Sequence, residues 1–434
     1  MRKIHQILFA CIISILSCKN DDTISEETVN PETNQPNILL IIADDMGLDA
    51  TPGFDEGVIK PNMPNLESFI ANGIKFNNLW SAPTCTPTRA TILTGKYGVK
   101  TGVLAVGDEM PTSETSIQSY LDNNTSQTYS HAVIGKWHLS NDAMSPTNMG
   151  IDYYAGLLNG GVQSYWNWNL TENGVTTIST EYTTTKFTDL AIDWVGAQEK
   201  PWFLWLAYNA PHTPFHLPPA TLHSQGDLPT DQASIDSNPL PYYMAALEAM
   251  DTEIGRLLSS FSEEARANTT IIFIGDNGTP NQVAQSPYNS NRVKGSLYQG
   301  GINVPMVVSG YGVNRSNQVE NAMINTADVF ATVADIANTG TTSIHNSISF
   351  KPLLIDANEE ERTFIYSEVE GQNGNGYTVR NETYKLIVFN DGTEGMYNLV
   401  EDPYENTNLL NEILSNTESI AKSDLEQRVE EIRQ

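Results

Sequence analysis

Cys85 is the residue of this sequence that most needs a chemical explanation. It is the only one of three cysteines outside the first 18 residues, and Pro87 and Arg89 follow it closely. A lone thiol is usually either a small buried hydrophobe or a reactive group. Without a second cysteine in the main part of the chain, an intramolecular disulfide is excluded. Residues elsewhere in the sequence must decide between the two alternatives.

Four other segments place acidic, basic or imidazole side chains directly after an apolar run. The apolar runs cover residues 37–43, 130–135, 201–208 and 270–275. The polar residues that follow them are Asp44, Asp45, Lys136, His138, His212, Asp276 and Asn277. Any one of these could belong to a loop cap or a turn, and Asp-Asn-Gly at 276–278 is a good turn sequence. Their occurrence at the same point of four segments predicts one shared site.

The acidic members of this set have the chemistry of a metal site. Asp44, Asp45, Asp276 and Asn277 all offer oxygen donors, and no cluster of His or Cys at zinc spacing accompanies them. Hard oxygen ligands favour Ca²⁺ or Mg²⁺ over zinc. A divalent cation would neutralise an anionic substrate and lower the pKa of a nucleophile beside it.

The elements that must position these residues are strands and helices in alternation. Continuous apolar runs are typical of strands buried on both faces, as in a parallel sheet. Helical patterns at residues 63–72, 188–197 and 242–261 separate them. The sequence therefore predicts an α/β fold with a large, mostly parallel sheet sandwiched by helices. Ligand sites form beyond the carboxyl ends of such strands. Lys136 and His138 would both point into the site if their segment stays extended.

Residues 346–434 have a different pattern of short apolar segments and turns, which predicts a smaller C-terminal antiparallel α+β subdomain. Apolar segments at 384–389 and 395–399 flank the turn residues Asn-Asp-Gly, which is typical of a β-hairpin. An acidic helix is expected over residues 417–434.

The N-terminal residues predict export. Arg2 and Lys3 precede a short apolar stretch that ends in I-L-S-C at Cys18. This pattern resembles a bacterial lipobox, so we expect a lipoprotein signal peptide at 1–17 and a flexible tether at 18–36. Lipid on Cys18 would then attach the chain to a membrane, as an exported lipoprotein of the outer membrane or cell surface. An ordinary secretory signal, with the periplasm as destination, is the alternative.

The charge of the chain limits its partners. It has 52 acidic against 23 basic residues and a net charge of −29. This excludes nucleic acid as a partner, because phosphates need a basic face. An anionic substrate must be held by a local basic pocket or a metal, because the field of the whole molecule repels it.

The motifs resemble one known family. Cys85-Thr-Pro-Thr-Arg89 resembles the C-x-P-x-R motif of the type I sulfatases, which belong to the alkaline phosphatase-like superfamily. Further similar segments lie at 37–45, 134–139, 209–212, 275–278, 293–305 and 397–409. The resemblance identifies residues 37–345 as a sulfatase catalytic domain. Thr88 and Lys96 depart from the residues that are usual in the family, and both could affect recognition by the modifying enzyme.

The resemblance implies that Cys85 is a precursor. In the family a formylglycine-generating enzyme oxidises this cysteine, and the hydrated aldehyde attacks sulfur. The family also favours calcium, held by the four oxygen donors together with position 85. Arg89 would hold the hydrate, and Lys136 would bind both the hydrate and the sulfate. His138 would help to remove the proton that releases sulfate.

The resemblance also implies how the leaving group is handled. His212 and Lys294 resemble the pair that contacts sulfate and protonates the leaving oxygen. The expected activity is hydrolysis of a sulfate ester, with a sulfated carbohydrate as the expected substrate. Residues 152–168 are rich in aromatic and amide side chains that suit sugar rings, or equally a cover over the sheet. His216 could line the same pocket.

Two other functions remain open from the sequence. One is a phosphodiesterase or phosphonate monoester hydrolase of the same superfamily. The other is a catalytically silent glycan-binding lipoprotein, which would keep a thiol at Cys85.

Overall fold

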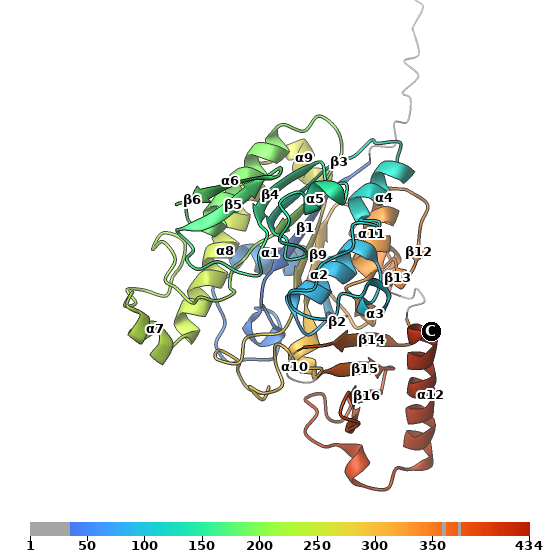
Figure 1. Cartoon of the computed structure of the whole chain (residues 1–434). Coiled ribbons are helices and arrows are strands. Elements are labelled where there is room, and N and C mark those ends of the chain that lie inside the picture. The colour runs from blue at the N-terminus through green and yellow to red at the C-terminus, as the bar shows by residue number, and fades with distance from the viewer. Residues whose placement is uncertain (1–34, 358–361, 372–374) are drawn as a thin grey trace, which may run out of the picture. The chain divides into compact units, whose positions relative to one another are not determined.

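The computed structural model describes residues 35–357, 362–371 and 375–434 (Figure 1). The predicted signal peptide, Cys18 and the tether up to residue 34 lie outside the described residues. Gln35–Gln434 form one compact unit, and the predicted boundary between residues 345 and 346 stays a prediction. Among the described residues, no helix is both long and apolar enough to cross a membrane.

The centre of the fold is an 11-stranded sheet, with the order β10-β2-β9-β8-β1-β7-β3-β4-β5-β6 and β11 beside β2. Its strands are β1 (Asn37–Ala43), β2 (Gly73–Trp80), β3 (Ser130–Lys136), β4 (Tyr153–Leu157), β5 (Trp168–Glu172), β6 (Val175–Ser179), β7 (Trp202–Ala207), β8 (Thr269–Gly275), β9 (Asn303–Gly310), β10 (Gln318–Glu320) and β11 (Ile324–Asn325). The central strands β8, β1, β7, β3 and β4 run parallel, whereas β9 and the β5–β6 pair are antiparallel to their neighbours. The prediction of a mostly parallel sheet is confirmed.

Helices cover both faces of this sheet (Figure 1). The described helices up to residue 336 are α1 (Pro64–Asn72), α2 (Cys85–Thr94), α3 (Gly98–Thr101), α4 (Ile117–Asn124), α5 (Ser145–Asn148), α6 (Thr183–Gly196), α7 (Gln232–Ser237), α8 (Leu240–Ser260), α9 (Glu263–Ala267), α10 (Gln299–Ile302) and α11 (Asp328–Ile336). α6 begins five residues earlier than the expected helix at 188–197. The prediction missed this first turn because it is rich in threonine and has no apolar pattern.

The two faces of the sheet bury separate cores. In β1, Leu40 packs with residues of α2, α4 and α11, whereas the next residue, Ile41, packs with residues of α1, α6 and α8. Successive side chains of a strand point to opposite faces, so an unbroken apolar run is buried on both. This burial explains why the four apolar runs were recognisable as strands.

The C-terminal residues form a second sheet of four antiparallel strands, in the order β14-β15-β16-β17. Its elements are β14 (Ile365–Val369), β15 (Gly376–Arg380), β16 (Tyr384–Phe389), β17 (Glu394–Asn398) and the helix α12 (Asn416–Arg433). The shorter elements of the chain are 3-10 helices at Leu48–Ala50, Lys351–Leu354 and Leu409–Asn411, and the pair β12 (Ser343–Ile344) and β13 (Ser347–Ile348). Leu425 and Val429 of α12 pack against Leu386 of β16, so the predicted α+β character is confirmed.

Candidate functional site

The site lies where the central strands end. β1 and β8 are parallel neighbours, with Ala43 opposite Gly275, so the aspartates that follow them come close together. The backbone N–H of Asp45 donates to Oδ1 of Asp276 at 3.0 Å. Asn277 donates from Nδ2 to Oδ1 of Asp45 at 2.7 Å. The three carboxylates and the amide therefore form one buried group, as the sequence predicts.

Cys85 stands at the first position of α2, with Thr84 as the N-cap residue. Its Sγ lies 3.2 Å from Nδ1 of His138. Sγ and carboxylate oxygens of Asp44 and Asp276 all lie within 4.8 Å of one another. The thiol is buried, yet it is held among acids and a histidine rather than in an apolar core, which favours the reactive alternative.

Three basic residues each pair with one carboxylate. Arg89 donates to Asp276 at 2.8 Å and also to the carbonyl oxygen of Lys136 at 2.8 Å. Lys136 is paired with Asp44. Lys294 lies 2.6 Å from the carboxylate of Asp45. Charges balance within these pairs, so an added divalent cation would make the site positive and attractive to an anion despite the negative charge of the whole chain.

The donor set fits a hard cation. Oδ1 of Asp44 and Oδ1 of Asn277 are buried and have no hydrogen-bond partner among the described residues. Such oxygens are costly to bury unless something satisfies them. Burial, helped by the nearby Asp44, raises the pKa of Asp276 to about 6 in the metal-free site. Crowded carboxylates and unpartnered oxygens together are what Ca²⁺ or Mg²⁺ would satisfy.

The two histidines approach Cys85 and Asp45 respectively, and both are held neutral. Burial, and then the charge of Lys136, lowers the pKa of His138 well below its ordinary range. Burial also lowers the pKa of His212 to about 4, although Asp45 acts in the opposite sense. Nδ1 of His212 donates to the carbonyl oxygen of Thr213 at 2.7 Å, which leaves Nε2, 3.7 Å from Asp45, as the atom that can exchange a proton.

His138 reaches the site by a different route from the one that we expected. We expected the chain to stay extended after β3, so that His138 would point the same way as Lys136. Instead, His138 has a φ of +56°, in the left-handed region. The chain turns there because the N–H groups of Trp137 and His138 donate to the carbonyl oxygens of Leu157 and Leu158, at 2.9 and 3.0 Å. The side chain of His138 is therefore placed by a turn and not by strand alternation.

Other residues that support the site were not recognised in the sequence. An added Cβ at Gly160 would lie 2.4 Å from the ring of His138, and one at Gly161 would lie 3.2 Å from the ring of His212. The hydroxyl of Tyr165 donates to the carbonyl oxygen of His212 at 2.6 Å. The hydroxyl of Tyr243 donates to the carbonyl oxygen of Asp45 at 2.7 Å. The Gly-Gly pair in an aromatic segment was the available signal.

His216, which the sequence suggested as a pocket residue, packs in an aromatic cluster. It is buried and stacks on Tyr165, with ring centroids 3.7 Å apart. Tyr182 forms a hydrogen bond with its Nε2 at 3.0 Å. His216 therefore supports the segment that holds His212, because aromatic neighbours occupy the space that a ligand would need.

The two departures from the usual motif have structural roles. The hydroxyl of Thr88 donates to the carbonyl oxygen of Thr84 at 3.1 Å, within the first turn of α2. Lys96 pairs with Glu114 at 2.6 Å. Neither side chain lies among the acids and bases around Cys85.

An open cavity of about 440 Å³ reaches this cluster from solvent. Asp45, Thr213 and Lys294 line its inner end, and Asn281, Gln282 and Asn291 supply amide groups farther out. A small anionic group could therefore reach Lys294 and the neighbouring carboxylate.

Comparison with known proteins identifies the family. The family model described as Sulfatase matches residues 36–339, and the one described as N-sulphoglucosamine sulphohydrolase, C-terminal, matches residues 293–434. The chain belongs to the sulfatase family, so the predicted resemblance to type I sulfatases of the alkaline phosphatase-like superfamily is confirmed. The enzyme class of this family, sulfuric ester hydrolase, is the class that the sequence predicts.

Its relatives include bacterial and mammalian proteins. An uncharacterized sulfatase, YdeN of Escherichia coli strain K12, is 27% identical over 367 residues, which cover 70% of this chain and 63% of that protein. Arylsulfatase G of Mus musculus is 26% identical over 379 residues, which cover 73% of this chain and 67% of that protein. This chain thus spans less than two thirds of the Escherichia coli relative.

Solved structures share the fold. Ps i-CgsB in complex with k-i-k-neocarrahexaose has a TM-score of 0.77 and 23% identity, with coverage of 92% of this chain and 94% of that chain. BT4656 in complex with its substrate D-glucosamine-2-N,6-O-disulfate has a TM-score of 0.73 and 20% identity, with coverage of 92% and 97%.

Proposed function

We propose that this chain hydrolyses sulfate esters of a carbohydrate, with position 85 converted to formylglycine and a calcium ion bound by Asp44, Asp45, Asp276 and Asn277. The observation that carries the proposal is the convergence of Cys85 with these oxygen donors, two of which have no protein partner. Calcium, when bound, supplies positive charge that offsets the sulfate ester and makes the nucleophile more acidic.

Different residues serve the proton transfers of the proposed reaction: His212 and Lys294 act on the leaving oxygen, and His138 acts on position 85. As a hydrate, side chain 85 carries two hydroxyl groups. One hydroxyl gives its proton to a neighbouring carboxylate as its oxygen attacks sulfur, and the ester S–O bond breaks. The alcohol leaves with a proton from the pair of Lys294 and His212: the Lys294 ammonium is the donor, and Nε2 of the neutral His212 can relay its proton to the leaving oxygen. His138 then removes the proton of the second hydroxyl, the C–O bond to sulfate breaks, and the aldehyde returns. The 3.2 Å contact between His138 and position 85 supports this assignment.

Arg89 and Lys136 hold the nucleophile and the anion in place. Arg89 is fully buried and joins Asp276 to the backbone of Lys136, so it fixes the carboxylate and the strand end together. Lys136, beside Asp44, supplies a charge near both position 85 and a bound sulfate. Donors that are fixed before the reaction cost no reorganisation when charge develops.

A carbohydrate substrate is supported by the sugar complexes of the structurally similar Ps i-CgsB and BT4656. The partners that we propose for maturation and placement are a formylglycine-generating enzyme and a membrane bound through lipid on Cys18. The second rests on the sequence of the first 18 residues alone.

Two measurements test the proposal. Mass spectrometry of the peptide that contains position 85 should show the aldehyde, and the purified chain should hydrolyse an aryl sulfate faster than an aryl phosphodiester. A faster phosphodiester reaction would favour the phosphodiesterase alternative. An unmodified thiol with no turnover of either ester would favour the glycan-binding lipoprotein.

A further inference from the structure

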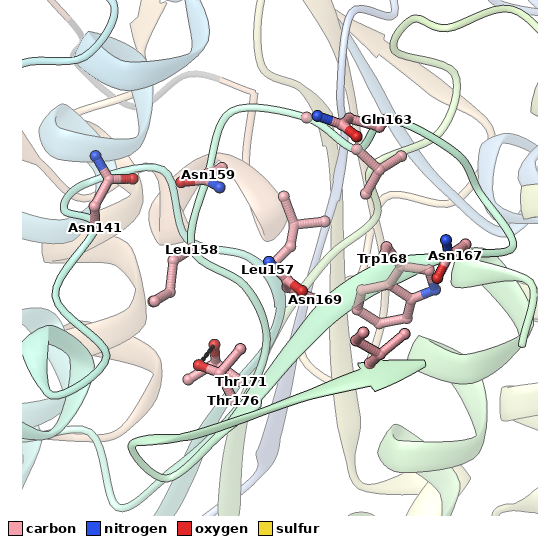
Figure 2. Close-up of a pocket in the computed structure, with 13 residues that line it drawn as sticks. Asn141, Leu157, Leu158, Asn159, Gln163, Asn167, Trp168, Asn169, Thr171 and Thr176 are labelled. Atoms are coloured by element: carbon pink, nitrogen blue, oxygen red, sulfur yellow. Dashed lines mark hydrogen bonds between the residues drawn. The ribbon is translucent and has the colours of Figure 1, made fainter. Parts of the chain in front are cut away.

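A second cavity, of about 430 Å³, is lined by the residues drawn in Figure 2. Its lining comes from the loop after β3, from the segment 157–163 and from the β5–β6 hairpin. In the hairpin, Asn169 lies opposite Ile178 and Thr171 opposite Thr176. These four residues share one face of the hairpin because side chains alternate along a strand, and that face forms a wall of the cavity.

The polar groups of this cavity are uncharged. None of its lining residues is acidic or basic. Five of them carry amides that are drawn in Figure 2: Asn141, Asn159, Gln163, Asn167 and Asn169. None of these amide side chains has a hydrogen-bond partner within the part of the chain that the structure describes. Each amide can donate and accept, which suits hydroxyl groups that also do both.

Apolar surface lies among these amides. The indole N–H of Trp168 donates to the carbonyl oxygen of Glu181 at 2.9 Å, and its ring packs edge-on against Phe187. Trp168 is only 4% exposed and belongs to the core on the opposite face of β5 from Asn169, so it supports the wall from behind. Ile178 is 70% exposed on the neighbouring strand. Apolar patches between convergent polar groups are typical of sites that bind small polar molecules such as sugars.

The cavity adjoins the reacting groups. Gly161 lines it, and an added Cβ at Gly161 would lie 3.2 Å from the ring of His212 and 3.7 Å from the carbonyl oxygen of Thr213. Thr213 lines the other cavity, together with Asp45 and Lys294. Residues 212–213 therefore lie next to both cavities.

We propose that the cavity beside the β5–β6 hairpin binds an uncharged sugar unit next to the sulfated one. The chain then prefers carbohydrates whose neighbouring unit carries neither sulfate nor carboxylate. Basic residues gather around Cys85, whereas this cavity has no charge to offset an anion, and burying an unpaired anion is costly. The preference for turnover rests on the proposed sulfatase function.

The test compares three substrates: 4-nitrophenyl sulfate, a singly sulfated disaccharide with a neutral neighbouring unit, and the same disaccharide with a uronic acid neighbour. The wild type should favour the neutral disaccharide. Asn169→Ala and Gln163→Ala should each lower kcat/KM on it by on the order of fivefold to tenfold, through lost hydrogen bonds. Their kcat/KM on 4-nitrophenyl sulfate should stay unchanged, because that ester reaches only the catalytic cluster.

Two further variants sharpen the comparison. Asn411→Ala removes an exposed amide of the C-terminal residues and should change none of the three rates. Asn169→Lys should shift the preference toward the uronic acid substrate. Equal losses on all three substrates, or a wild-type preference for the charged neighbour, would overturn the proposal.

A binding measurement distinguishes failure of the sugar-binding cavity from failure of the proposed sulfatase function. If the wild type hydrolyses no sulfate ester, the sulfatase assignment fails by itself. Calorimetric titration with the neutral disaccharide then decides on the cavity, since binding that Asn169→Ala weakens supports it and absence of binding overturns it.

Discussion

Gly160→Ala should slow turnover without unfolding the protein, because it displaces His138. An alanine Cβ at this position would lie 2.4 Å from both Cε1 and Nε2 of the ring, whereas ordinary contact begins at 3.4 Å. The ring must therefore retreat by about 1 Å. A catalytic group misplaced by about 1 Å costs on the order of 100-fold in rate.

Gly161 and Gly196 provide graded controls. A Cβ at Gly161 would lie 3.2 Å from the ring of His212, so the neighbour has to give by only a few tenths of an ångström. If the barrier rises in proportion to displacement, Gly161→Ala should cost about two- to fourfold. A Cβ at Gly196, at the end of α6, meets nothing within 4 Å, so Gly196→Ala should leave kcat unchanged.

The assay is kcat on a saturating aryl sulfate, corrected for the aldehyde content at position 85 and accompanied by thermal unfolding. We expect the loss to fall on kcat more than on KM, because His138 acts after the substrate is bound. A Gly160→Ala variant with native unfolding and undiminished kcat would refute the packing argument. So would a larger loss at Gly161 than at Gly160.

Three other predictions concern the nucleophile, the metal and pH. Cys85→Ser and Cys85→Ala should abolish turnover of an aryl sulfate while circular dichroism stays native, and full activity of either variant would refute the mechanism. Chelation of divalent cations should abolish turnover and lower the unfolding temperature, because the carboxylates of Asp44 and Asp276 then lie close together without a cation between them. Added Ca²⁺ should restore both the turnover and the unfolding temperature. Activity that survives metal-free dialysis would contradict the metal site. Burial lowers the pKa of His216 from 6.5 to about 4, so the unfolded state binds the proton more readily between these values. The free energy of unfolding should therefore fall by up to about 3 kcal/mol as the pH drops through this window. His216→Gln should reduce that dependence in urea denaturation at pH 7 and 4.5, and an unchanged slope would disprove it.

The buried strands could be predicted from the sequence because their surroundings leave a simple pattern. β1 is apolar along its full length, since both its faces meet helices, and its observed bounds are those of the predicted run. The β5–β6 hairpin was missed for the opposite reason. Its strands are short, and most residues of β6 are exposed, so no apolar run marks it. The turn at Asn173 and Gly174, both with positive φ, was the usable signal.

The types of the reactive side chains could be predicted from the sequence, but the residues that hold these side chains in position could not. Asp44 and Asp276 follow recognisable strands, so their meeting at one edge follows from the topology. Lys294 comes from a loop without such a pattern, and only the family resemblance pointed to it. Gly160 and Tyr165 act by contact with histidines that are distant in sequence, which no local pattern encodes.

The burial of Cys85 sets a condition on when the chain can mature. Only 2% of this residue is exposed, and α2 holds it against the ends of two neighbouring strands. On the proposal that position 85 becomes formylglycine, an oxidising enzyme could not bind the surrounding pentapeptide once α2 has packed against the sheet. The proposed conversion would then have to precede the packing of α2, during or soon after synthesis.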